Sequence, residues 1–104
     1  MYALNLFIPV SHIDVVKKAI FKAGAGKYNA YEQCCWQTLG HGQFYSSNFS
    51  SPFIGKKNEV TQVEEYFLQT ICTDDKLREV LSAYINNHPY EEPAFYYWQI
   101  NSFY

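Results

Sequence analysis

The sequence predicts an α+β domain with a ferredoxin-like β-α-β-β-α-β order, in which two helices cover one face of a four-stranded antiparallel sheet. Three observations predict this fold. Four apolar segments rich in aromatic residues are typical of strands, and two other segments repeat apolar residues at helical spacing. The length of 104 residues suits one domain, which we place at residues 1–104.

The first strand is expected from Tyr2 to Pro9, where the proline ends it. The first helix is expected from Ser11 to Ala23, with apolar residues on one face and lysines on the other. Ser11 is the predicted N-cap, and Asp14 takes the place of the capping-box glutamate three residues later. Gly24 stands where a helix C-cap belongs.

The two central strands are expected from Gln33 to Tyr45 and from Val60 to Cys72. Gly40 and Gly42 interrupt the first of them, which indicates a bulge or a close backbone approach. Uneven alternation in the second indicates another bulge near Glu64–Glu65. The loop between these strands carries Phe53 and Ile54, which we expect to anchor it to the body of the domain.

The second helix is expected to begin at Thr73 or Asp74 and to end at Asn86 and Asn87, because Pro89 prevents its continuation. The last strand is expected from Ala94 to Phe103. In this topology no helix covers the second face of the sheet. Since large exposed apolar patches mark partner surfaces, we expect self-association through that face or through the strand edges.

Composition and charge exclude several classes of protein. Eight Lys and Arg stand against ten Asp and Glu, which gives a formal charge of −2 at pH 7. This balance argues against a nucleic-acid partner, because binding to nucleic acid relies on many clustered Lys and Arg residues. The N-terminal segment lacks the basic start of a signal peptide, and no uncharged stretch is apolar enough to span a membrane. We therefore expect a cytoplasmic protein with no membrane partner.

The densest polar cluster is the run His88-Pro89-Tyr90-Glu91-Glu92-Pro93. Imidazole and carboxylate groups suit divalent transition metals, so His88 and Glu91 are candidate metal ligands. The alternative is structural: the prolines shape a rigid turn, His88 bonds the helix end, and the glutamates face water or a lysine.

Glu64 and Glu65 form a second acidic pair, inside a predicted strand. Strand alternation sends their side chains to opposite faces, so this pair cannot converge on one substrate.

The three cysteines are too few for a disulfide scaffold and are expected as buried free thiols. Pairing of the central strands could still bring Cys34 or Cys35 opposite Cys72.

Four stretches of the chain, taken together, resemble one known family: GAGKYNAYEQCCWQTLGHGQF (24–44), PFIG (52–55), VEEY (63–66) and HPYEEPAFYYW (88–98). They resemble the Nif-three-like family and, within it, the small domain inserted in YqfO-type members and its stand-alone relatives. The HPYE run and the strand order also resemble the trimeric CutA-like, PII-related domains. The resemblance implies a ferredoxin-like domain of CutA type.

The resemblance also implies a role in assembly, regulation or ligand sensing, because the dimetal site and any cyclohydrolase-type chemistry of the larger relatives belong to flanking domains. We expect a non-catalytic homo-oligomer, a trimer or a dimer, with a small ligand or a divalent metal in an intersubunit cleft. The alternatives are a divalent-metal binder of CutA type and, less favoured, a metal-dependent hydrolase. No residue is assigned to catalysis, and the ligand-binding or interface candidates are His41, Glu64, Glu65, His88, Tyr90, Glu91, Glu92 and Trp36.

Overall fold

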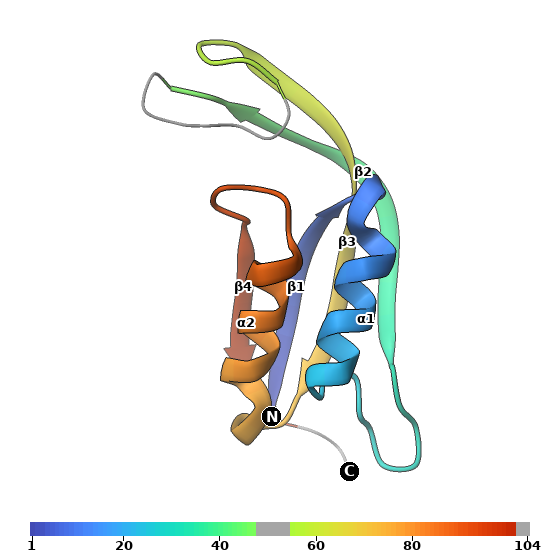
Figure 1. Ribbon diagram of the computed structural model, residues 1–104. Coiled ribbons are helices and arrows are strands. Elements are labelled where there is room, and N and C mark those ends of the chain that lie inside the picture. Colours follow the sequence, from blue (N-terminus) through green and yellow to red (C-terminus); the bar gives the residue numbers. More distant parts are fainter. Residues whose placement is uncertain (48–54, 102–104) are drawn as a thin grey trace.

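The computed structural model describes residues 1–47 and 55–101 and confirms the α+β fold (Figure 1). Its strands are β1 (Tyr2–Pro9), β2 (Cys35–Tyr45), β3 (Val60–Cys72) and β4 (Phe95–Gln99). They form one antiparallel sheet in the order β2-β3-β1-β4. The helices α1 (Ile13–Ala23) and α2 (Leu77–Asn87) lie over the same face of this sheet (Figure 1). Each follows a short 3-10 turn, η1 (Val10–His12) or η2 (Asp74–Lys76).

The core lies between the helices and the covered face of the sheet. Alternate residues of β1 point to this side, so Leu4, Leu6 and Ile8 are fully buried. The apolar stripes of the two helices pack on them, and the buried residues of these stripes are Ile13, Val16, Ile20, Val80 and Tyr84. Neither helix, nor any other described one, is long and apolar enough to cross a membrane.

The boundaries of β1 and β3 and the C-terminal ends of both helices agree with the prediction. Gly24 caps α1 in the left-handed region, with φ of 118°. The predicted N-cap is wrong, because α1 starts only after η1 and has His12 at its N-cap position. The Ser11 hydroxyl lies 2.7 Å from Nδ1 of His12 and makes no capping hydrogen bond.

Both predicted bulges are wrong. The strands β2 and β3 pair residue for residue from Cys35 opposite Thr70 to Tyr45 opposite Val60, through both glycines and both glutamates. This long hairpin extends past the helices and bends over one end of the sheet (Figure 1). Cys35 therefore faces Thr70 and not Cys72, and all three cysteines are free.

The strand β4 ends at Gln99, earlier than the predicted Phe103. Phe53, Ile54 and Phe103 lie outside the described residues.

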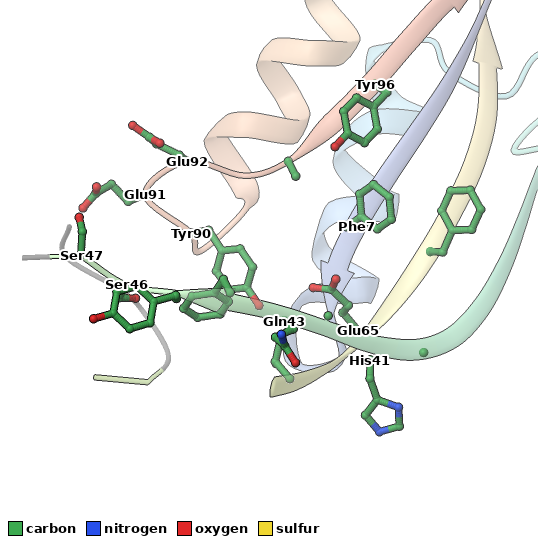
Figure 2. A pocket seen from close by; sticks show the side chains of 17 residues that line it. Phe7, His41, Gln43, Ser46, Ser47, Glu65, Tyr90, Glu91, Glu92 and Tyr96 are labelled. Carbon is green, nitrogen blue, oxygen red and sulfur yellow. The ribbon is translucent and has the colours of Figure 1, made fainter. Parts of the chain in front are cut away.

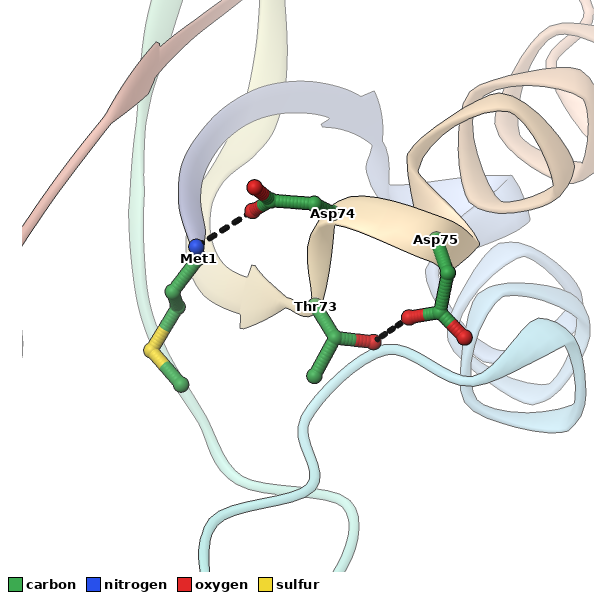
Figure 3. Close-up of polar contacts among 4 residues, drawn as sticks. All are labelled: Met1, Thr73, Asp74 and Asp75. Carbon is green, nitrogen blue, oxygen red and sulfur yellow. Dashed lines mark hydrogen bonds and ion pairs between the residues drawn. The ribbon is translucent and has the colours of Figure 1, made fainter.

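The first and last described segments meet at one end of the sheet. The Ile100 N–H donates to the carbonyl oxygen of Met1 at 2.9 Å. The Met1 ammonium forms an ion pair with Asp74, at the start of η2 (Figure 3). Beside it, the Thr73 hydroxyl donates to Asp75 at 2.6 Å, which lowers the pKa of this carboxyl. The N-terminus is thus fixed between the last strand and the start of α2.

Candidate functional site

The face of the sheet without helices carries a patch that we call the aromatic face. Its exposed rings are Trp36, Tyr96 and Trp98, with exposed fractions of 61%, 60% and 45%. They come from the two edge strands, β2 and β4, and the strands between them contribute Ala3, Asn5, Gln69 and Ile71. At its centre the Gln69 side-chain amide donates to the Asn5 side-chain oxygen at 3.0 Å, so the middle of the face is polar.

A pocket of about 660 Å³ adjoins the aromatic face and shares Tyr96 with it, where the bent hairpin passes over the end of the sheet (Figure 2). Three parts of the fold form it. The sheet contributes its floor, the hairpin contributes one wall through residues 40–47, and the loop between α2 and β4 contributes the other through Tyr90, Glu91, Glu92 and Ala94.

Aromatic rings line much of the pocket. Phe7 stacks on Phe67 with ring centres 5.3 Å apart, and Tyr96 meets Phe7 edge-on at 6.1 Å. Across the pocket, Phe44 of the hairpin lies 6.4 Å from the ring of Tyr90. The rings come from all four strands and the α2–β4 loop, so the complete fold is needed to assemble the pocket.

Glu65 supplies the carboxylate at the floor of the pocket (Figure 2). Its side chain lies against Gly42 of the neighbouring strand, where a Cβ atom would overlap with the carboxylate. Gly42 therefore provides the space that Glu65 occupies. Burial raises the pKa of Glu65, because a carboxylate loses hydration there.

Tyr90 and His88 join the pocket to the core. Burial and the nearby charge of Glu65 raise the pKa of Tyr90 to about 12. Behind it, Nε2 of the buried His88 lies 2.7 Å from the carbonyl oxygen of Phe7, and the Tyr90 N–H donates to its Nδ1 at 3.1 Å. Since a carbonyl oxygen only accepts, the proton of the neutral ring is on Nε2. Burial lowers the pKa of His88, which favours this neutral form.

The structure brings together only part of the predicted site. Glu65, Tyr90, Glu91 and Glu92 all line the pocket. His41 lies at the rim with its ring pointing away (Figure 2). The remaining candidates lie elsewhere: Glu64 opposite His41 in the β2–β3 pairing, His88 in the core, and Trp36 on the aromatic face.

The geometry does not favour a metal site at His88 and Glu91. Both ring nitrogens of His88 already bond backbone groups, so binding a metal would break one of these hydrogen bonds. Within residues 1–47 and 55–101, no group of three or more His, Cys, Asp or Glu side chains is arranged to hold a metal ion. The metal-ligand set stays a prediction.

Sequence reasoning missed the aromatic floor formed by Phe7, Phe67 and Tyr96. The sequence contains a pattern that could have predicted this floor, since strand alternation sends these residues to the same uncovered face. Gly42 gave a second signal, because a glycine inside a strand indicates a close approach. Here the approaching group is a side chain of the paired strand.

The chain matches no protein-family model. Among curated proteins, it is similar to "GTP cyclohydrolase 1 type 2 homolog" of Halalkalibacterium halodurans, with 40% identity over 95 residues, which are 91% of this chain and 26% of the relative. A protein of the same description from Mycobacterium leprae is 37% identical over 90 residues, covering 86% of this chain and 23% of the relative. The chain thus spans about a quarter of the length of the curated relatives it matches.

Solved structures agree on the fold. A Bacillus cereus protein related to NIF3 superposes with a TM-score of 0.80 and 30% identity, over 97% of this chain and 26% of that protein. The PII-like protein CutA from Nostoc superposes with a TM-score of 0.68 and 16% identity, over 97% of this chain and 82% of that one. GlnK from Bacillus subtilis gives a TM-score of 0.63 at 11% identity, over 95% and 83% of the two chains. The last two similarities show the fold alone.

Proposed function

We propose that the chain, which is similar to one segment of NIF3-related proteins and has the ferredoxin-like fold of CutA and PII-like proteins, is a non-catalytic domain that self-associates and acts in assembly or ligand sensing. The observation that carries the proposal is the aromatic face. Three large rings are about half exposed or more on a sheet surface that no helix covers. Large exposed rings gathered on one uncovered face favour a face that binds a partner.

A second copy of the chain is the occupant that we propose for this face. Tryptophan and tyrosine supply much of the binding energy in protein interfaces, and here they lie on both sides of a small polar centre. The edge strands β2 and β4 also border the face, and an unpaired edge can extend a sheet into another copy. Both features favour a symmetric homo-oligomer, a dimer or a trimer.

The proposal assigns no reaction to this domain. The relatives that are named as cyclohydrolase homologues are about four times as long, and the chain matches only one segment of them. Metal-assisted hydrolysis needs three protein ligands that converge on one metal ion. Among the described residues that line the pocket there is no such set.

Size-exclusion chromatography with light scattering tests the assembly. Wild type at micromolar concentration is expected to exceed the monomer mass of 12.2 kDa, and the double variant Trp36→Glu/Trp98→Glu is expected to fall to it. Tyr31→Glu is the matched control, because this ring is 71% exposed but lies in the α1–β2 connection and not on a strand of the aromatic face. A wild-type monomer would contradict self-association.

A further inference from the structure

We propose that the pocket under the bent hairpin binds an organic cation, a small molecule that joins an amine or guanidinium group to a flat apolar body. This inference rests on the ligand-sensing part of the proposed function and names the class of ligand. Described residues of one chain line the pocket, which shares Tyr96 with the aromatic face, so binding is measured both on wild type and on the assembly variant Trp36→Glu/Trp98→Glu.

The charged side chains among the described lining residues are acidic, and Lys57, which pairs with Ser46 at the rim, is not part of the lining. Its lining includes the carboxylates of Glu65, Glu91 and Glu92, and among the described residues that form it there is neither a lysine nor an arginine. Like charges repel and opposite charges attract most strongly where water is partly excluded. The lining therefore disfavours phosphates and carboxylates and favours a cation.

Glu65 is the specific partner for that cation. It lies deepest of the three carboxylates, in the space left open by Gly42, whereas Glu91 and Glu92 are exposed at the rim. The ion pairs of the described residues join Met1 to Asp74 and Lys76 to Glu79, and neither involves Glu65. Burial already raises the pKa of Glu65, and a bound cation would offset this penalty by pairing with the carboxylate.

The aromatic rings define the rest of the ligand. Phe7, Phe67 and Tyr96 surround the floor beside Glu65, and their faces attract cations as well as flat apolar groups. The volume of about 660 Å³ lies in the range of small-molecule sites. A molecule with one ring system and a short cationic arm can contact both the rings and the carboxylate.

Three probes with the same ring system test the inference: tryptamine, which is a cation, tryptophol, which is neutral, and indole-3-acetate, which is an anion. Two-dimensional NMR titrations of the full chain are expected to show saturable shifts with tryptamine at residues around the pocket. Binding should be weaker with tryptophol and absent with indole-3-acetate. Equal binding of all three probes, or no binding of tryptamine, would overturn the inference.

Two isosteric variants locate the charge. Glu65→Gln is expected to weaken tryptamine binding about tenfold, because an ion pair in a partly buried site is lost. Glu64→Gln is the matched control, since this neighbour points to the opposite face of the same strand, and its affinity should equal that of wild type. Equal affinities of the two variants would contradict the role of Glu65.

The two proposals fail in different ways. A monomer that binds tryptamine through Glu65 would contradict assembly and support the cation site. An oligomer that binds none of the probes would support assembly and overturn the cation site.

Discussion

Tyr84 and His88 hydrogen-bond the same atom, the carbonyl oxygen of Phe7, at 3.0 Å and 2.7 Å. The Tyr84 hydroxyl also lies 2.8 Å from the carbonyl oxygen of Ala94 and accepts the Phe7 N–H at 3.3 Å. These contacts join the end of α2 to β1 and to the start of β4. Since Phe7 also lines the pocket, the same contacts hold the pocket floor against the α2–β4 loop.

Replacing Tyr84 by Phe should therefore destabilise the domain. The hydroxyl is buried, and its loss leaves backbone groups of Phe7 and Ala94 with fewer partners. We expect a loss of about 1–3 kcal/mol in the free energy of unfolding, measured by urea denaturation. Tyr31→Phe, at a ring that is 71% exposed, should change stability by less than about 0.5 kcal/mol. Equal effects of the two variants would contradict the role of the hydroxyl.

His88 should make the domain less stable in mild acid. Burial lowers its pKa in the folded state below the ordinary value of 6.5, so the unfolded chain binds the proton more readily. The stability is fully present above pH 6.5 and is lost as the pH falls through the lowered pKa. Urea denaturation between pH 7.5 and pH 5 should show this decline in wild type and in His41→Gln, but not in His88→Gln. A decline in His88→Gln as steep as that of wild type would assign the effect to another group.

The two glycines of β2 should respond differently to alanine. An added Cβ has nothing within 4 Å at Gly40, but it overlaps with the Glu65 carboxylate at Gly42. Gly40→Ala should change stability by less than about 1 kcal/mol, whereas Gly42→Ala must displace the flexible end of the Glu65 side chain and should cost up to about 1 kcal/mol more. In a Glu65→Ala background the cost of Gly42→Ala should fall to that of Gly40→Ala. A cost independent of Glu65 would show that the backbone, and not the carboxylate, requires glycine there.

Glu65→Gln should give a domain at least as stable as wild type at neutral pH. Burial raises the folded-state pKa of Glu65 above 4.5, so its stabilising contribution is fully present below pH 4.5 and is lost as the pH rises through the raised pKa. Glutamine does not ionise and removes this decline, whereas Glu64→Gln should retain it. Stability curves from pH 4 to pH 7.5 without ligand measure the difference. A large loss of stability in Glu65→Gln would show that the carboxylate is paired in the free protein.

The sequence predicted the fold well where local signals are strong. Pro9 ends β1, Gly24 ends α1 and Asn87 ends α2 as expected, because each is a local effect of the backbone. The expected bulges failed because the register is unbroken: Gly42 instead leaves room for the Glu65 side chain of the paired strand.

The site was predicted less completely, because it depends on how distant segments meet. The run after α2 was expected to carry polar function, and three of its residues line the pocket. Which of Glu64 and Glu65 points into the pocket depends on strand register, because a shift of one residue would exchange the two faces of the strand. The bend of the hairpin over Phe7 and Tyr96 involves four segments and has no local signal.

The backbone contact between Met1 and Ile100 has a consequence for architecture. A unit whose entry and exit are hydrogen-bonded neighbours can be spliced into a surface turn of a host protein without forcing the host to open, because the two connectors start a few ångströms apart.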